Sequence, residues 1–158
     1  MIDIILSGAN GRMGQVLQTM IAQQPEMQVV AGVDREAFEA DFPTYQSMAD
    51  CQVEADVIID FSHYSAVPAV LDYSADKKIP VVVATTGLTD EIKKQIEKTA
   101  EQTAVFFSAN MSLGINLLAK AIREITPVLE DEFNIEIVEK HHNQKKDSPS
   151  GTALLLAD

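Results

Sequence analysis

Five short apolar runs alternate with segments of helical periodicity over the first two thirds of the chain. The runs cover residues 2–6, 28–33, 55–61, 80–84 and 104–107. They are rich in β-branched residues and end at glycine or polar residues, as strands do. Between the first two runs, apolar residues recur at helical spacing from Val16 to Ile21, before Pro25. Apolar strands that alternate with helices predict a parallel sheet with helices on both faces, which is a doubly wound α/β domain.

The other elements of this domain follow the same rules. Apolar residues around Val70 predict a helix after the third strand. Thr89 can cap a further helix. Asp90 and Glu91 in the first turn of that helix interact favourably with the positive end of its dipole. Residues 35–55 show weak periodicity, so only a loop and a short helix are predicted there.

The pattern changes after about residue 110, and we place a boundary between a domain of residues 1–109 and one of residues 110–158. The second begins with a longer helix, which Pro127 is expected to end or kink. Apolar and polar residues alternate over 133–139, which predicts a strand with one wet face, and a helix begins near Ser150. One strand and two helices are few for a domain, so we expect an incomplete α+β unit and a fragment of a longer protein.

Charge and cysteine content narrow the class of function. Asp and Glu number 24 against 12 Lys and Arg, which gives a formal net charge of −12. Such a charge repels phosphate backbones, so no nucleic acid partner is expected. Cys51 is the single cysteine, and no apolar stretch is long enough for a membrane span or a signal peptide. We therefore expect a cytoplasmic globular protein with no membrane contact.

A glycine-rich turn lies between the first strand and the first helix. It reads Gly8-Ala9-Asn10-Gly11-Arg12-Met13-Gly14. Glycines there allow a pyrophosphate to approach the backbone closely, and the N-terminus of the helix offers unpaired N–H groups to the anion. The spacing is one residue longer than the common G-x-G-x-x-G pattern, so a purely structural turn is the alternative interpretation.

An acidic residue follows at the distance that a dinucleotide site requires. Asp34 ends the second strand about twenty residues after the turn, where a carboxylate accepts hydrogen bonds from the adenosine ribose. Arg35 comes next and can pair with a 2′-phosphate. The two side chains together leave both NADH and NADPH open, and a solvated carboxylate is the alternative for Asp34.

Polar residues also follow three strands at their carboxyl ends, where open α/β sheets bind ligands. They lie in the segments Asp60-Phe61-Ser62, Ala84-Thr85-Thr86-Gly87 and Ser108-Ala109-Asn110-Met111. An ordinary turn explains each segment by itself, so only their combination favours a ligand site. His63 stands apart from any other histidine and is interpreted as structural.

A cationic segment near the end of the chain contains most of the candidate catalytic side chains. It reads Glu139-Lys140-His141-His142-Asn143-Gln144-Lys145-Lys146-Asp147-Ser148-Pro149-Ser150-Gly151-Thr152-Ala153. In an acidic chain, this local reversal of charge suits a small dianionic ligand. His141 can exchange a proton near neutral pH, and Lys145 is a compact positive charge. A solvated loop is the competing interpretation, and no metal is expected because the ligand spacing is irregular.

Together these motifs resemble the bacterial 4-hydroxy-tetrahydrodipicolinate reductase family, also called dihydrodipicolinate reductase. The cationic segment fits the family signature E-x-H-H-x-x-K-x-D-x-P-S-G-T-A at every fixed position. The glycine turn and the three strand-end segments match further family motifs in the family's order. Ala84 departs from the pattern, because the family usually has glycine there.

The resemblance implies a Rossmann-type NADH- or NADPH-dependent oxidoreductase of diaminopimelate and lysine biosynthesis, a homotetramer that reduces a cyclic unsaturated imine dicarboxylate. Hydride would pass from nicotinamide C4 to the imine, converting 4-hydroxy-tetrahydrodipicolinate to tetrahydrodipicolinate. The implied cofactor residues are Gly8, Ala9, Asn10, Gly11, Arg12, Met13, Asp34, Arg35, Ala84, Thr85, Thr86, Ser108, Ala109, Asn110 and Met111. The implied proton donors are His141 and Lys145. The implied residues for the substrate carboxylates are His142, Lys145, Ser150, Gly151 and Thr152.

Two other functions stay open from the sequence. One is another Rossmann-type amino acid dehydrogenase, of the aspartate type, and the other is a non-catalytic dinucleotide-binding module. Family members continue beyond the position of Asp158, so we also expect this chain to bind dinucleotide and to turn over poorly. A steady-state assay that showed turnover like that of a full-length enzyme would contradict this expectation.

Overall fold

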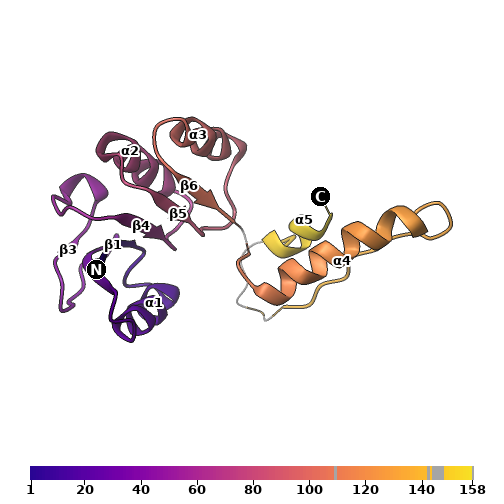
Figure 1. The fold of residues 1–158 in the computed structure, drawn as a ribbon, viewed down its shortest axis with the longest axis horizontal. Coiled ribbons are helices and arrows are strands. Elements are labelled where there is room, and N and C mark those ends of the chain that lie inside the picture. The colour runs from indigo at the N-terminus through magenta and orange to yellow at the C-terminus, as the bar shows by residue number, and fades with distance from the viewer. Residues whose placement is uncertain (109, 142, 144–147, 158) are drawn as a thin grey trace. The chain divides into compact units, whose positions relative to one another are not determined.

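A computed structural model describes residues 1–108, 110–141, 143 and 148–157 of the chain. The chain divides into two compact units, Met1–Phe107 and Ser108–Asp158, which are called unit 1 and unit 2 below (Figure 1). Among the described residues, no helix combines the length and the apolar character that crossing a membrane requires.

Unit 1 is a six-stranded parallel sheet with the order β3-β2-β1-β4-β5-β6. The strands are β1 (Ile2–Ser7), β2 (Met27–Val33), β3 (Thr44–Tyr45), β4 (Val57–Asp60), β5 (Val81–Val83) and β6 (Val105–Phe107). The helices are α1 (Arg12–Ala22), α2 (Val67–Lys77), α3 (Asp90–Ala100) and the 3₁₀ turn η1 (Met48–Asp50). Figure 1 shows α1 on one side of the sheet and α2 and α3 on the other. The predicted doubly wound α/β fold is therefore confirmed.

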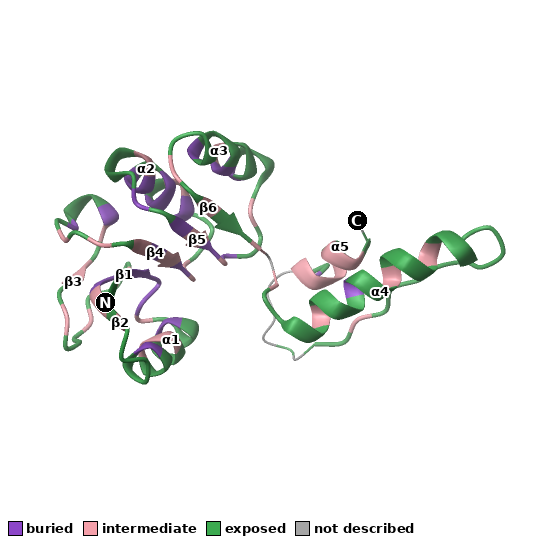
Figure 2. Cartoon of the chain, viewed as in Figure 1, coloured by how far each residue is buried: buried purple, intermediate pink, exposed green. Residues whose placement is uncertain are grey.

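The core of unit 1 lies between the central strands and α2. Ile5, Ile58 and Leu71 have no exposed surface, and Figure 2 shows the buried residues concentrated on these elements. Each side chain of this size contributes about 1.5–3 kcal/mol when it leaves water. The burial of both faces explains why the central strands appear in the sequence as continuous apolar runs.

The strand order reverses between β1 and β4. From β1 the chain passes through α1 to β2 on one side, and β4 pairs with β1 on the other side. The loops that leave β1 and β4 therefore diverge and open a crevice at the carboxyl ends of the strands, the usual ligand position in such sheets.

Helix α3 begins where the sequence predicts. The Thr89 hydroxyl accepts a hydrogen bond of 3.4 Å from the Ile92 N–H. Hydrogen bonds from its own backbone N–H and from Thr89 lower the pKa of Glu91. This agreement shows that local capping chemistry is enough to place the start of the helix.

Unit 2 contains α4 (Leu113–Leu129) and α5 (Gly151–Ala157). Pro127, expected to end or kink the first helix, does not end it, because α4 continues through this residue to Leu129. A proline in the last turn removes only one backbone hydrogen bond, and the chain tolerates that loss. The helix predicted near Ser150 is confirmed as α5.

The predicted strand at 133–139 is wrong, because residues 133–140 have no regular secondary structure. The alternation of apolar and polar residues indicates that the apolar side chains need to be buried on one face. A strand also needs a neighbouring strand that forms hydrogen bonds with its backbone. Among the described residues of unit 2 no strand supplies such pairing. The sequence also missed β3, which has only two residues and thus no detectable period.

A buried tyrosine gives unit 1 a pH-dependent stability. The Tyr73 hydroxyl donates to the Cys51 carbonyl oxygen at 3.2 Å, and burial, followed by the nearby Cys51, raises the pKa of Tyr73 to about 12. The folded chain favours the neutral phenol, so its contribution is complete below pH 10 and is lost as the pH rises from about 10 to 12. Urea denaturation measures the free energy of unfolding of the unchanged chain and of a Tyr73→Phe variant between about pH 10 and 12. In this range the value for the unchanged chain should fall by up to about 1.4 kcal/mol more per pH unit than the value for the variant. Parallel pH profiles of the two proteins would contradict this.

Candidate dinucleotide-binding and catalytic sites

The turn between β1 and α1 is packed so closely that glycine is required. Gly8 has a φ of +78°, and a Cβ atom there would lie 2.5 Å from the Phe61 carbonyl oxygen. A Cβ atom on Gly14 would overlap the Gly8 carbonyl oxygen. The Gly8 N–H donates to the Val33 carbonyl oxygen at 2.8 Å. The turn therefore lies directly against the ends of β2 and β4, with no space for side chains.

A side chain of α1 and one from the residue after β2 hold this turn in place. The Gln18 side-chain amide donates to the Ala9 carbonyl oxygen at 2.7 Å, and the Asn10 N–H donates to Asp34 Oδ2 at 3.1 Å. Gly11 is the N-cap of α1, with no capping side chain, and the first turn has no acidic residue. The positive end of the helix dipole is thus not neutralised by a side chain of α1 itself.

A cleft of about 450 Å³ opens at the switch point beside this turn. It is lined by Ser7, Gly8, Gly11, Val33, Asp34, Arg35, Gln46, Ser47, Met48, Phe61, Ser62, His63, Ser65, Ala66, Ala69 and Val70. Four residues that the sequence assigned to a cofactor, Gly8, Gly11, Asp34 and Arg35, are among them. The cleft therefore combines a close backbone turn, a carboxylate and an exposed guanidinium group.

Other sequence-predicted residues of unit 1 do not line this cleft. Ala9 is fully buried. Thr85 is 4% exposed, and its hydroxyl donates inward to Asp60 Oδ2 at 2.6 Å. The rest of this group comprises Asn10, Arg12, Met13, Ala84 and Thr86. Ala109, His142 and Lys145, which the sequence also assigned to the site, lie outside the described residues.

Sequence reasoning missed the opposite wall of the cleft. Met48 comes from η1, and Ala69 comes from α2. His63, interpreted from the sequence as structural, also lines the cleft, and its Nδ1 lies 2.8 Å from the Ser65 hydroxyl. No local pattern marks these residues, because only the sheet topology brings η1 and α2 to the carboxyl ends of β1 and β2.

In unit 2, Asn110 connects the start of α4 with the start of α5. Its side-chain amide donates to the Thr152 hydroxyl at 2.7 Å, and its Oδ1 accepts from the Ser112 N–H at 2.8 Å. The Ser108 hydroxyl donates to the Asn110 carbonyl oxygen at 2.9 Å. Two motifs that are about forty residues apart in the sequence are therefore adjacent within this unit.

A second cluster in unit 2 orients a histidine. His141 Nδ1 lies 3.4 Å from Glu139 Oε2, and the Ser150 N–H donates to Glu139 Oε1 at 2.9 Å. The Ser150 hydroxyl accepts from the Ala153 N–H at 3.0 Å and so caps α5. Nδ1 of His141 therefore faces the Glu139 carboxylate, and Nε2 is the ring nitrogen on the far side of the imidazole.

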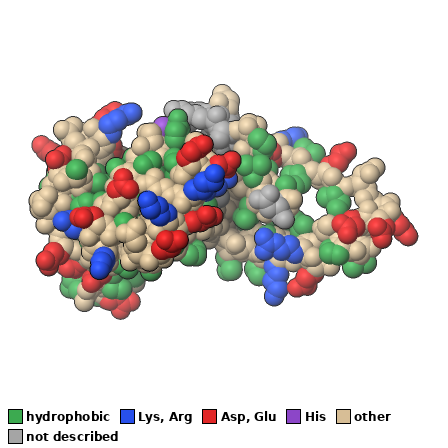
Figure 3. Space-filling view, turned by 90° about the horizontal axis from the view of Figure 1, so that it is seen from above, with side chains coloured by type: hydrophobic (Ala, Val, Ile, Leu, Met, Phe, Trp, Pro, Cys, Tyr) green, Lys and Arg blue, Asp and Glu red, His purple; other side chains and the backbone are tan. Residues whose placement is uncertain are grey.

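Charges are distributed over the surface of both units. In Figure 3, acidic side chains lie over both, and fewer basic ones lie among them. Among the described residues, no cluster of three or more His, Cys, Asp or Glu side chains could hold a metal ion.

The sequence profile described as "Dihydrodipicolinate reductase, N-terminus" matches residues 2–111, and the profile described as "Dihydrodipicolinate reductase, C-terminus" matches residues 114–158. The 4-hydroxy-tetrahydrodipicolinate reductase of Caldanaerobacter subterraneus subsp. tengcongensis is 52% identical to the chain over 158 residues. The match covers 100% of this chain and 62% of that relative. The chain thus spans less than two thirds of the length of its relative.

Solved structures give a consistent picture. The dipicolinate-bound dihydrodipicolinate reductase from Paenisporosarcina sp. TG-14 aligns with a TM-score of 0.78 and 27% identity, over 99% of this chain and 64% of that one. Aspartate dehydrogenase from Thermotoga maritima aligns with a TM-score of 0.58 and 12% identity, over 78% of this chain and 52% of that one, which shows a shared fold alone. Both family profiles match, and the cationic segment fits the family signature, so this chain belongs to the dihydrodipicolinate reductase family.

Proposed function

We propose that the chain is the nucleotide-binding and proton-donating part of an NADH- or NADPH-dependent reductase acting on a cyclic unsaturated imine dicarboxylate. The substrate is 4-hydroxy-tetrahydrodipicolinate and the product is tetrahydrodipicolinate, in diaminopimelate and lysine biosynthesis. The observation that carries the proposal is the cleft of unit 1 beside the glycine turn, in a chain with the family's complete cationic signature. A cytoplasmic location and a homotetramer are part of the same proposal.

The residues of unit 1 fit the adenosine and pyrophosphate parts of a dinucleotide. Gly8 and Gly11 form a cradle that side chains would fill, and the N-terminus of α1 adds N–H groups for the pyrophosphate. Asp34 would bind the ribose, although its Oδ2 also accepts from the Asn10 N–H. The same carboxylate would thus hold both the turn and the sugar, which couples their positions.

Unit 2 would supply the groups for the substrate. The dinucleotide, when bound, supplies the hydride. His141, oriented by Glu139, would donate the proton that neutralises the charge left by hydride addition, and Lys145 would be a second donor. His142, Lys145, Gly151 and Thr152 would hold the two carboxylates, with cationic and N–H groups stabilising the dianion.

Arg35 should decide part of the preference between the two cofactors. Its side chain is 90% exposed, and its ion pair with Glu36 is long, at 3.9 Å. The guanidinium group is therefore available for a 2′-phosphate. An Arg35→Ala variant should bind NADPH about tenfold more weakly, which corresponds to about 1.4 kcal/mol, and should bind NADH with unchanged affinity. Fluorescence titration with each cofactor measures this difference. Equal changes for the two cofactors would contradict a phosphate contact.

Titration with NADH and NADPH, with and without dipicolinate, tests the proposed function. Dipicolinate is the ligand in the solved relative from Paenisporosarcina, and its two carboxylates match the expected substrate charge. We expect dinucleotide to bind in these titrations, and a separate steady-state assay with the imine substrate measures its reduction. A chain that binds no dinucleotide would overturn the proposal, and one that binds it but reduces no imine would be a non-catalytic module.

A further inference from the structure

A buried carboxyl group joins the ends of two strands in unit 1. Asp60, the last residue of β4, has no exposed surface. Its Oδ1 accepts from the Ser62 hydroxyl and its Oδ2 from the Thr85 hydroxyl, both at 2.6 Å. Thr85 follows β5, so this carboxyl group connects the segments that leave two adjacent strands.

The surroundings of Asp60 are poorly suited to a carboxyl group. In the sheet it pairs with Ser7 of β1 and with Val83 of β5, both buried, and it closes a strand whose other fully buried residue is Ile58. Among the described residues, no ion pair includes Asp60. Burying such a group is unfavourable, and the two hydroxyl hydrogen bonds offset only part of that. The two hydroxyl hydrogen bonds are therefore the contacts that account for a carboxyl group at this position.

The position of Asp60 suggests a role for this carboxyl group. Its carbonyl oxygen accepts from the Ala84 N–H at 2.9 Å, and the Phe61 N–H donates to the Ser7 carbonyl oxygen at 3.0 Å. The Phe61 carbonyl oxygen also lies 2.5 Å from the position that a Cβ atom on Gly8 would take. The segment around Asp60 therefore touches both the glycine turn and the segment after β5, whose residues 84–86 the family resemblance assigns to the cofactor.

We propose that Asp60 is a positioning residue, which holds the Thr85 side chain inward and thereby fixes the backbone of residues 84–86 for the nicotinamide ring. The inference rests on the proposed function. The inference also limits the role of Thr85 as a cofactor residue. Because its hydroxyl donates to Asp60, only its backbone would contact the cofactor. Asp60 acts through Thr85 and does not itself touch the cofactor.

A pair of Thr85 variants tests this inference. Thr85→Val removes the hydroxyl but keeps the shape of the side chain, and Thr85→Ser keeps the hydroxyl. Dissociation constants are measured for NADH and for ADP-ribose, which lacks the nicotinamide. Thr85→Val should bind NADH about tenfold more weakly, the effect of about one hydrogen bond, while its affinity for ADP-ribose changes less than about twofold. Thr85→Ser should restore NADH binding.

The fluorescence of bound NADH gives an independent measurement. The reduced nicotinamide is excited at wavelengths where protein side chains do not absorb, so its emission is observed directly. With Thr85→Val, the anisotropy of NADH at saturation should fall, because the ring is held less firmly. With Thr85→Ser it should match that of the unchanged chain.

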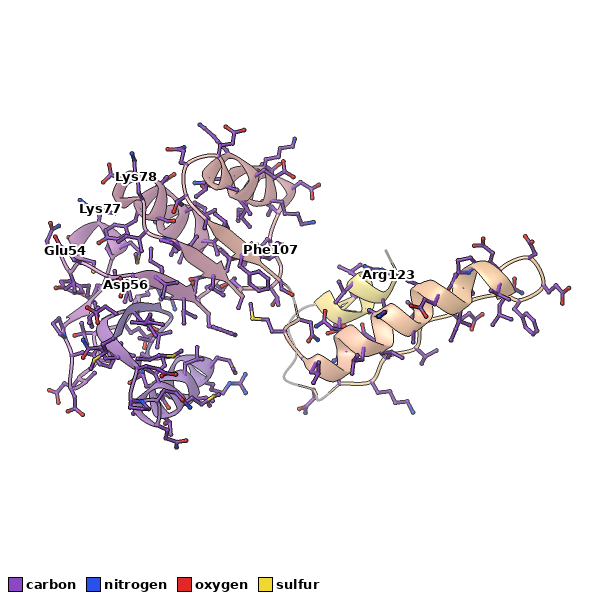
Figure 4. The ribbon with its side chains drawn as sticks, in the orientation of Figure 1. Glu54, Asp56, Lys77, Lys78, Phe107 and Arg123 are labelled. Atoms are coloured by element: carbon purple, nitrogen blue, oxygen red, sulfur yellow. The ribbon has the colours of Figure 1, made fainter. Side chains whose placement is uncertain are left out.

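Two controls separate positioning from general destabilisation. Thr99→Val alters another threonine that is 4% exposed, on α3. Asp56→Asn alters an exposed carboxylate at the amino end of β4, labelled in Figure 4. Neither should change the preference for NADH over ADP-ribose. If Thr85→Val weakens both ligands equally, or neither, the positioning role is overturned while the proposed function stands. If the unchanged chain binds neither ligand, the proposed function itself fails.

Discussion

A Gly8→Ala variant is expected to lose dinucleotide binding by a factor of at least about 100, which corresponds to about 2.7 kcal/mol. Two effects add at this position. The φ of +78° disfavours any residue with a Cβ atom by about 1–2 kcal/mol, and that atom would lie 2.5 Å from the Phe61 carbonyl oxygen. The backbone must move to relieve the overlap, and that movement displaces the turn that would hold the pyrophosphate. Calorimetric titration with NADH measures the loss.

Gly87 provides a matched control for the stability part of this prediction. Its φ of +73° is nearly the same, but a Cβ atom there would meet no other atom within 4 Å. Gly87→Ala should therefore lower the free energy of unfolding by about 1 kcal/mol, whereas Gly8→Ala should lower it by roughly 3 kcal/mol or more. Equal losses in the two variants would show that the close packing at Gly8 has no energetic importance.

His141→Ala is expected to lower the rate of imine reduction about 10²–10⁴-fold, the usual range for a lost proton donor. The reason is the geometry of unit 2, where Glu139 holds Nδ1 at 3.4 Å and leaves Nε2 for proton transfer. The affinity for NADH should stay within about threefold, because His141 belongs to unit 2 and the cleft proposed for the dinucleotide belongs to unit 1. Steady-state rates relative to the unchanged chain, combined with a binding titration, measure both quantities.

His63→Ala is the contrasting variant. His63 lines the cleft of unit 1, which we propose holds the dinucleotide, so its replacement should weaken cofactor binding and leave the maximal rate unchanged. A rate that is insensitive to His141→Ala would contradict the role of His141 as proton donor. Such a rate would assign the proton to a group other than His141.

The strand predicted at 133–139 is absent because apolar alternation alone does not make a strand. Phe133, Ile135 and Ile137 alternate with polar residues as in a half-buried strand, yet all three are exposed and form no ladder. Alternation indicates which side chains need cover. It does not indicate whether a neighbouring strand is present to pair with the backbone.

The sequence by itself determined the five longer strands, the helices between them, the glycine turn and Asp34. These features arise from local causes: apolar period, capping residues and the conformational freedom of glycine at Gly8. Only the tertiary structure decided that η1 and α2 form the second wall of the cleft and that Asp60 holds Thr85 away from it. Such contacts join residues that are distant in the sequence, and strand order, which no local pattern encodes, brings them together.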